Sequence, residues 1–397
     1  MFHIGIRRDE SKLKKKIIEE VERILGRRSF RMQAGTPKHK VGLQTLLNTE
    51  LEELAKMGDG IAIRGISGMG GLGKTTLAKE VYNHYSQENT FECQTFLELG
   101  KGADMVTLQR QALNDLLQKK GVENVSENYN YWFSRLIGRS VLIVIDDILN
   151  DDQFMQLVPD LTRLGPKSRI ILTSREQNVL RLIMSDIPNS SLHIMRPLKL
   201  EDSFELFTFH AFKGTKPPSK ASNLKMYDLA TRITCSCDGL PMALEIIGKH
   251  MFGKEEDVWI RTAETLQSRP EVLSKLSISF EGLPSEAEKT MFLDIACQMI
   301  GLHVADAIDI WESCGPSCTY LCSMSRNVPD SLAILKDKSL IDVDTNNILT
   351  MHDLLREMGK ELVCKEKIGG KPLPFGDRSH LWDLHAESLL EKGKVCI

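Results

Sequence analysis

The segment GMGGLGKTT at residues 68–76 constrains the fold of this chain more than any other feature. It fits the pattern G-x-x-x-x-G-K-[ST] through Gly68, Gly73, Lys74 and Thr75. The β-rich run GIAIRGI precedes it, and the helical stretch LAKEVYNHY follows it. Glycines let backbone N–H groups close around phosphate oxygens, and the start of a helix adds partial positive charge. The segment therefore predicts a phosphate-binding loop between a strand and a helix.

The polar side chains of this loop have separate expected roles. Lys74 is expected to reach the β- and γ-phosphates of a nucleotide and to act in catalysis. The Thr75 hydroxyl is expected to hold Mg²⁺. The remaining positions of the expected phosphate cradle are Gly68, Gly70, Gly71, Gly73 and Thr76.

Short β-rich runs alternate with helical stretches from about residue 60 to residue 197. The runs are GIAIRGI at 60–66, QTFLEL at 94–99, SVLIVID at 140–146, SRIILTS at 168–174 and SLHIM at 191–195. Strands that alternate with helices favour a parallel sheet covered by helices on both faces. The run VLIVI is apolar at every position, which is typical of a central strand buried on both sides. This half of the chain is therefore expected to be an α/β P-loop NTPase domain.

Polar residues follow two of these runs. Asp146 and Asp147 end VLIVIDD, where Asp146 is expected to bind Mg²⁺ and Asp147 to orient or deprotonate an attacking water. Arg175 follows SRIILTS, and an arginine at the carboxyl end of a parallel strand can sense a γ-phosphate. Acids in this position often only cap helices, and such an arginine is often a surface ion pair. The glycine-rich loop upstream favours the functional interpretation of all three.

After residue 197 the alternation of β-rich runs and helical stretches gives way to a series of helical stretches. Stretches such as DSFELFTFHAF, LKMYDLATRI, LPMALEIIGKHM, VLSKLSISFEGL and EAEKTMFLDIACQMI read as helices. Nearer the end, LIDV and ILTM are expected to pair through the turn DTNN, ahead of the helix DLLREMGKELV, which suggests a winged-helix unit. Pro241 is expected near the start of a helix. Thr350 and Asp353 fit a capping arrangement for the last helix.

Length and composition narrow the class of protein. A chain of 397 residues predicts two or three domains, and a net charge of -3 gives no general attraction to nucleic acid or anionic membrane. The longest apolar run, VLIVI, is far too short to span a bilayer, so we expect no membrane insertion. No C-x-x-C pair is present, and Cys314, Cys318 and Cys322 are interpreted as structural thiols, with a metal site as the alternative. A reduced, cytosolic protein is expected.

The motifs together resemble the NB-ARC region of plant NLR immune receptors, which are STAND-class P-loop NTPases. GMGGLGKTT, VLIVIDD, SRIILTSR, GLPMAL and MHD occur in the order typical of that family, over residues 40–365. FLDIAC and the lead-in SKLKKKIIEEVERIL are similar to the TIR class, and DRSHLWD resembles the lead into leucine-rich repeats. Two positions depart from the family pattern: Met242 stands where leucine is usual, and Leu149 stands where aspartate or tryptophan is usual.

The resemblance implies a domain order. The expected segments are a linker helix and arm at 1–40, a nucleotide-binding domain at 41–197, a helical ARC1 subdomain at 198–265, a winged-helix ARC2 subdomain at 266–365 and a linker toward a repeat region at 366–397. Neither a TIR domain nor a leucine-rich repeat region is expected within this sequence.

The resemblance also implies a switch, closed with ADP and open with ATP, in which the open form oligomerises and slow ATP hydrolysis resets it. Val41 and Gly42 match the family's loop near adenine, and Arg175 would read the γ-phosphate. Pro241 would pack on the sugar and base. His352 would contact the β-phosphate of ADP, while Asp353 helps to hold the closed state. The expected ligands are ADP or ATP with Mg²⁺, in the cytoplasm or nucleus.

Two other functions fit parts of the sequence. One is an AAA-type or helicase-like ATPase whose purpose is turnover. The other is a nucleic-acid-binding STAND regulator that uses the winged-helix end. The balanced charge of DLLREMGKELVCKEK argues against duplex binding, because a recognition helix is usually basic.

Overall fold

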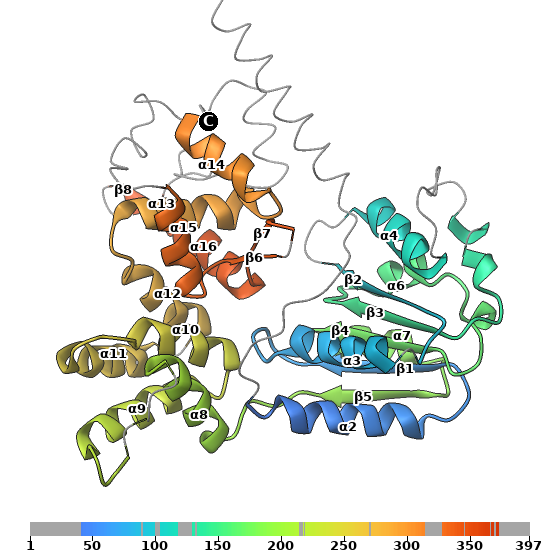
Figure 1. Ribbon diagram of the computed structural model, residues 1–397, viewed down its shortest axis with the longest axis horizontal. Coiled ribbons are helices and arrows are strands. Elements are labelled where there is room, and N and C mark those ends of the chain that lie inside the picture. The colour runs from blue at the N-terminus through green and yellow to red at the C-terminus, as the bar shows by residue number, and fades with distance from the viewer. Residues whose placement is uncertain are drawn as a thin grey trace, which may run out of the picture. The chain divides into compact units, whose positions relative to one another are not determined.

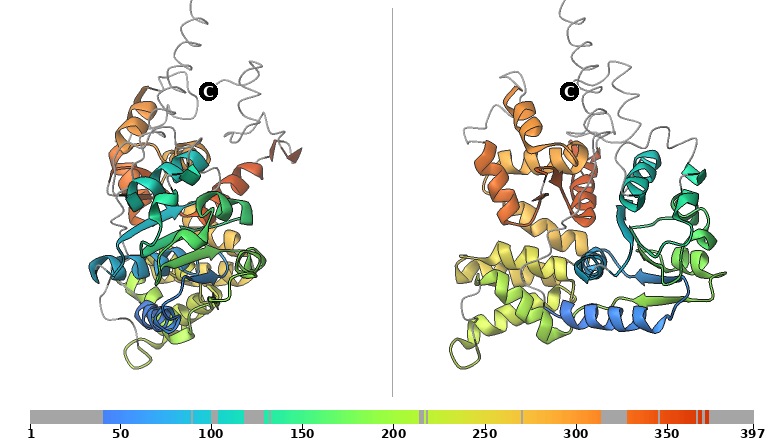
Figure 2. Two further views of the ribbon diagram at one scale, coloured as in Figure 1. Left: turned by 90° about the vertical axis from the view of Figure 1, so that its right-hand side faces the viewer. Right: turned by 45° about the vertical axis from the view of Figure 1, so that its right-hand side comes forward.

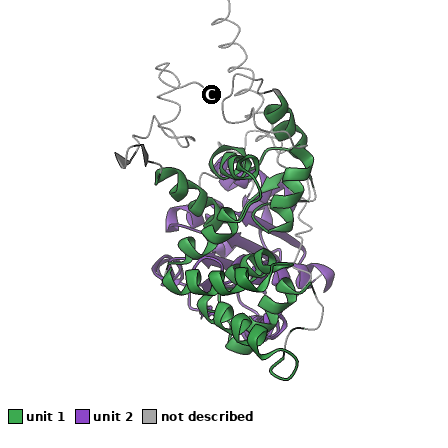
Figure 3. Cartoon of the chain, turned by 90° about the vertical axis from the view of Figure 1, so that its left-hand side faces the viewer, with its two compact units in different colours: residues 1–25, 198–397 green, residues 26–197 purple. Residues whose placement is uncertain are grey.

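The computed structural model describes residues 41–372 except 89, 100–103, 118–128, 132, 214–216, 218, 270, 314–327, 345, 366 and 369–370. The described residues up to Pro197 form one compact unit, and those from Leu198 onward form a second (Figure 3). The expected linker helix, the three cysteines at 314, 318 and 322 and the segment DRSHLWD lie outside the described residues. Within the described part of the chain, no helix combines the length and apolar character needed to cross a bilayer.

The first unit is built on a five-stranded parallel sheet, as the alternating pattern predicts (Figure 1). The strands are β1 (Ala62–Ser67), β2 (Cys93–Glu98), β3 (Val141–Asp146), β4 (Arg169–Ser174) and β5 (Ser190–Ile194). Their order across the sheet is β2-β3-β4-β1-β5, with every neighbouring pair parallel. Strand β4 therefore lies between β1, which leads into the glycine-rich loop, and β3, which carries the two acids.

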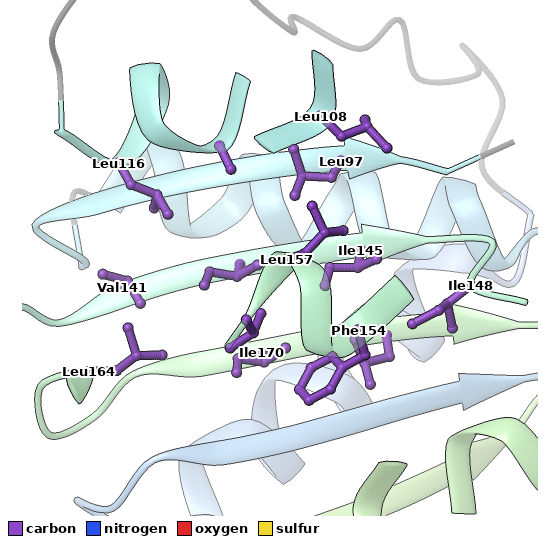
Figure 4. Close-up of a cluster of buried hydrophobic side chains, with 14 of the residues drawn as sticks. Leu97, Leu108, Leu116, Val141, Ile145, Ile148, Phe154, Leu157, Leu164 and Ile170 are labelled. Atoms are coloured by element: carbon purple, nitrogen blue, oxygen red, sulfur yellow. The ribbon is translucent and has the colours of Figure 1, made fainter. Parts of the chain in front are cut away.

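Helices cover both faces of this sheet, as the α/β prediction requires (Figure 2). The helices are α2 (Leu43–Lys56), α3 (Lys74–Glu88), α4 (Met105–Leu117), α6 (Asp151–Leu157) and α7 (Gln177–Met184), with short 3₁₀ turns at Ser134–Leu136 and Leu161–Arg163. Side chains of α4, α6 and α7 form one apolar core with β1, β2, β3 and β4, which includes Leu108, Leu116, Phe154 and Ile145 (Figure 4). Because β1, β3 and β4 are buried along their whole length, the sheet is a rigid base for the loops at its ends.

A buried ionic cluster fastens α2 to the opposite face of the sheet. Glu50 of α2 is fully buried and accepts two hydrogen bonds from Arg64 of β1, at 2.7 Å from Nε and 2.9 Å from Nη2. His193 of β5 contacts the same carboxylate through Nδ1, and Ser191 accepts a bond of 2.8 Å from Arg64. Burial raises the pKa of Glu50, but the bonds from Arg64 and His193 outweigh it and lower that pKa to about 2. No motif in the sequence predicted that these side chains would meet.

The second unit is mainly helical, in agreement with the pattern beyond residue 197. Its helices are α8 (Leu200–Ala211), α9 (Leu224–Ser236), α10 (Pro241–Met251), α11 (Glu256–Ser268), α12 (Val272–Glu281), α13 (Glu286–Asp294), α14 (Val304–Ser313), α15 (Val328–Asp337) and α16 (Asp353–Cys364). The helices α11, α14 and α15 were not predicted from the sequence. Pro241 is the first residue of α10, as expected.

The end of this unit has the strand pair and helix expected of a winged-helix unit. Strands β6 (Asp342–Val343) and β7 (Leu349–Thr350) pair antiparallel ahead of α16, and a further short pair, β8 (Lys367–Ile368) with β9 (Lys371–Pro372), follows it. The segment FLDIAC ends α13 and enters a π-helical turn at Ile295–Met299. Gly359 of α16 lies so close to this turn that an added Cβ would be 2.6 Å from the Cβ of Ala296. This glycine therefore lets α16 pack directly against the FLDIAC segment.

Candidate functional site

The glycine-rich loop connects β1 to α3 at the carboxyl end of the sheet. Gly71 and Gly73 adopt φ values of 80° and 93°, which side chains with a Cβ rarely adopt. The N–H of Gly68 donates to the carbonyl of Ser174 at the end of β4, at 3.3 Å. The Lys74 ammonium is buried and donates to the carbonyls of Gly68 and Met69, at 2.7 and 3.0 Å. The lysine side chain therefore lies over the same loop whose backbone N–H groups are expected to bind phosphate.

The first residues of α3 bring the loop next to the acid at the end of β3. Thr75 Oγ1 donates to Asp146 Oδ2 at 2.8 Å. The second carboxylate oxygen, Asp146 Oδ1, accepts a bond of 2.5 Å from Thr173 Oγ1 of β4. Thr75 and Asp146 were predicted as the two magnesium ligands, and the structure places their oxygens side by side. Open parallel sheets bind ligands at this edge.

The environment of Asp146 fits a site for a divalent cation. Its carboxyl group is buried, and burial raises its pKa to about 6, although the bonds from Thr173 and Thr75 act in the opposite direction. A buried carboxylate of this kind is stabilised by a positive charge bound against it. The donor set of a carboxylate and a hydroxyl oxygen suits Mg²⁺, which prefers oxygen ligands and keeps several waters.

Asp147 and Arg175 lie at the same edge of the sheet. Asp147 has a left-handed backbone with φ of 58°, and its N–H donates to Thr173 Oγ1 at 2.9 Å. Arg175 Nε is 3.7 Å from Asp147 Oδ1, so the residue predicted to sense a γ-phosphate pairs with the residue predicted to handle the water. The ion pair considered as the alternative for Arg175 is thus present, and it involves a residue of the predicted site.

The remaining nucleotide-site candidate in the first unit precedes α2. Gly42 adopts φ of 69°, and its carbonyl accepts the N–H of Leu46 at 3.3 Å, which starts the helix. Val41 comes directly before it. Their contact with adenine stays a prediction.

The two candidates in the second unit each stand at the start of a helix. Pro241 begins α10 after a turn in which Asp238 and Gly239 both have positive φ, and Lys275 of α12 forms an ion pair with Asp238. The buried ammonium of Lys275 therefore fixes the turn that presents Pro241. The predicted roles of Pro241 and His352 at a nucleotide stay predictions.

The capping arrangement predicted from Thr350 and Asp353 is wrong. The helix α16 begins at Asp353, and its N-cap is His352, whose Nδ1 accepts the N–H of Leu354 at 3.1 Å. Thr350 pairs with Asp342 in the strand β7 instead. The short strand extends through Thr350, which leaves the chain too extended there to start the helix. His352 thus has a structural role, which is the usual role of a lone histidine at such a position.

Sequence reasoning missed Thr173, which contacts both acids of the predicted site. The available signal was a polar side chain directly after the apolar run IIL at 170–172. That signal is weak, because strand ends often carry threonine.

The comparisons with known proteins agree with this arrangement. Residues 43–216 match the NB-ARC domain, and residues 285–367 match the winged-helix domain of Roq1-like disease resistance proteins. The TMV resistance protein N of Nicotiana glutinosa is 33% identical over 86% of this chain and 28% of its own length. The disease resistance protein RUN1 of Vitis rotundifolia is 32% identical over 94% of this chain and 26% of its own length.

The chain thus spans between a quarter and a third of the length of these relatives. Among solved structures, a signal transduction ATPase with numerous domains and a tetratricopeptide repeat sensor from Pyrococcus horikoshii aligns with 85% of this chain and 44% of its own. Its identity is 15% and its TM-score is 0.47, which is too loose a match to bear on the site.

Proposed function

Because this chain belongs to the NB-ARC family of TIR-class plant disease-resistance proteins, we propose that it works as an ADP/ATP switch of an innate immune receptor. In the proposed cycle, ADP holds a closed, inactive state and ATP holds an open state that oligomerises. Slow hydrolysis resets the switch. The observation that carries the proposal is the Thr75–Asp146 pair beside the glycine-rich loop, because it joins a phosphate cradle to a cation site.

In this proposal each site residue of the first unit has a separate role. The loop amides and Lys74 bind phosphate oxygens, and Thr75 and Asp146 hold Mg²⁺. The cation would offset negative charge on the phosphates. Asp147 orients water, and Arg175 reads the γ-phosphate. Arg175 Nε lies 3.7 Å from Asp147 Oδ1, so the residue proposed to read the γ-phosphate contacts the residue proposed to orient the water.

The second unit is proposed to contain two subdomains. In this proposal α8 to α11 make up ARC1, and α12 to α16 with the β6–β7 hairpin make up ARC2. The expected boundary after residue 265 falls inside α11 and is therefore moved to the end of that helix at Ser268. Pro241 at the start of α10 and His352 at the start of α16 are the proposed nucleotide contacts of these subdomains. The site of action is proposed to be the cytoplasm or the nucleus.

The proposal is tested by the nucleotide that co-purifies with the protein and by its turnover. We expect about one ADP per chain after gel filtration, and ATP hydrolysis well below ~1 s⁻¹, the low end of typical enzyme rates. Turnover at or above that rate would instead favour an ATPase of the AAA or helicase type. A preparation that neither retains nor binds adenine nucleotide would exclude the switch.

His352→Ala is expected to release ADP faster than the wild-type protein and to favour the oligomeric state. A hydrogen bond to a charged group is worth ~1.5–3 kcal/mol, so its loss shifts the balance between the states by about 10–150-fold. The companion change Asp353→Val is expected to act in the same direction. ADP retention is measured by chromatography of the bound nucleotide, and the oligomeric state by light scattering.

A control is needed because His352 also caps α16. Asparagine is a good N-cap residue, so His352→Asn preserves the cap while removing the imidazole. If His352→Asn retains ADP as the wild type does while His352→Ala does not, the effect of the alanine comes from the lost cap. That pattern would contradict the proposed phosphate contact.

A further inference from the structure

Thr173 is the residue that connects the two acids of the site. It lies near the end of β4, between β1 and β3, with a side chain that is 1% exposed. Its hydroxyl donates to Asp146 Oδ1 at 2.5 Å and accepts the N–H of Asp147 at 2.9 Å. A hydroxyl has one proton and two lone pairs, while an ionised carboxylate only accepts and an N–H only donates. Both bonds therefore have a defined direction, and one buried hydroxyl serves both acids.

The bond to Asp146 fixes the orientation of that carboxylate. Thr173 holds Oδ1, and Thr75 holds Oδ2 at 2.8 Å, so the two oxygens are restrained from different elements. Of these two hydroxyls, that of Thr75 is itself a predicted magnesium ligand and would be shared with the cation. When the Thr75 hydroxyl also binds the cation, its bond to Asp146 is shared with the metal. The hydrogen bond from Thr173 then still restrains the carboxylate.

The bonds to the backbone hold the turn that follows β3. Asp147 has φ of 58°, a conformation that costs energy for a residue with a side chain and persists where neighbours enforce it. The Thr173 hydroxyl accepts the N–H of Asp147, and the Thr173 carbonyl accepts the N–H of Ile148 at 2.9 Å. Side chain and main chain of one residue thus restrain two successive amides of the turn.

We propose that Thr173 is a positioning residue for the magnesium-bound nucleotide. Its hydroxyl aligns the Asp146 carboxylate toward the cation and keeps Asp147 in its left-handed turn. This inference rests on the proposed nucleotide-binding function. It predicts that removing the hydroxyl weakens the contribution of Mg²⁺ to nucleotide binding, and leaves the binding of nucleotide without Mg²⁺ nearly unchanged.

The test is calorimetric titration of the full chain with ATP, first in EDTA and then at increasing Mg²⁺. For Thr173→Val, which keeps the branched shape, we expect the Mg²⁺ concentration that gives half of the affinity gain to rise about 10-fold, the size of one lost bond to a charged group. Affinity in EDTA should stay within about 2-fold, because the loop and Lys74 are untouched. Thr173→Ser restores the hydroxyl and should recover the wild-type Mg²⁺ dependence.

A matched control exists on another strand. Thr95 of β2 is also buried and donates to a carboxylate, Asp115 Oδ2, at 2.8 Å, but Asp115 belongs to α4 and not to the predicted site. Thr95→Val should therefore leave the Mg²⁺ dependence unchanged. If Thr173→Val does not fold, Thr173→Ala removes the same hydroxyl with a smaller side chain and carries the same expectation.

The outcomes separate this inference from the proposed function. Wild-type protein that binds no nucleotide at any Mg²⁺ concentration would overturn the function and the inference together. Wild-type binding that depends on Mg²⁺, with the same dependence in Thr173→Val, would overturn the inference alone. Equal losses in EDTA and in Mg²⁺, or a failure of Thr173→Ser to recover, would show a general structural role and overturn it as well.

Discussion

Lys74→Arg is expected to abolish nucleotide binding, although it keeps the positive charge. The Lys74 ammonium is buried and reaches the carbonyls of Gly68 and Met69 at 2.7 and 3.0 Å. An ammonium is a compact charge with three donors, whereas a guanidinium is a larger planar fork that this closed loop does not accommodate. Lys74 is proposed to bind the β- and γ-phosphates, and the loss of two charge-assisted bonds to phosphate oxygens, at ~1.5–3 kcal/mol each, corresponds to at least about 100-fold weaker binding.

The measurement is the amount of nucleotide retained on purification, together with the Kd for ADP from calorimetry. Lys56→Arg is the control, because Lys56 is exposed at the end of α2 and pairs with Glu53. This control should bind ADP as the wild type does. A Lys74→Arg protein that purifies with one nucleotide per chain would refute the cradle assigned to this loop.

Glu50→Gln is expected to lower the free energy of unfolding of the first unit by about 3–5 kcal/mol, the cost of breaking a buried ion pair by removing one partner. Glu50 is fully buried, and Arg64 is 6% exposed, so the substitution leaves a guanidinium without its counter-ion inside the protein. A change of 1 kcal/mol moves the transition temperature of a domain this size by about 2–4 °C. Calorimetry of the full chain should therefore show one transition lowered by about 10 °C.

The control for this prediction lies on the same helix. Glu53 pairs with Lys56 at the surface, and exposed pairs contribute little, so Glu53→Gln should leave the transition temperature unchanged. If Glu50→Gln melts as the wild type does, the buried cluster does not secure α2 to the sheet.

The same cluster predicts a pH dependence with a defined sign. The pKa of Glu50 is lowered from 4.5 to about 2, because the bonds from Arg64 and His193 outweigh the effect of burial. The folded state thus releases the proton more readily than the unfolded state does. The contribution of Glu50 to stability is complete above pH 4.5 and is lost as the pH falls toward 2. Unfolding measured across this range should show that loss in the wild type, and Glu50→Gln should lack it.

Much of the nucleotide-binding unit could be predicted because its signals are local. All five strands were located within one or two residues, since each is a short β-rich run that alternates with helical stretches. The loop was identified with its flanking strand and helix, because glycine spacing and helix initiation are properties of neighbouring residues. In the second unit the hairpin ahead of α16 was found for the same reason. The helices α11, α14 and α15 were not predicted, although α11 has buried apolar residues at helical spacing, such as Trp259, Ala263 and Leu266.

The contacts between the residues of the site could not be predicted from local sequence patterns. Thr75, Asp146 and Thr173 are far apart in the chain and meet only because β4 inserts between β1 and β3. Alternation of strands and helices predicts a parallel sheet, but the order of strands in it depends on which pairs bury the most surface. The same holds for Glu50 and Arg64, whose meeting requires α2 to lie across β1 and β5.

By itself the sequence determined the five strands of the first unit and the position of the phosphate-binding loop, because periodicity, glycine placement and helix starts act between residues that are close in the chain. Tertiary structure alone decided which hydroxyls hold the Asp146 carboxylate, that Arg175 pairs with Asp147, and that His352 rather than Thr350 caps α16. Those outcomes depend on strand order and on where each element ends. Both are settled by packing and hydrogen bonding between segments distant in the chain.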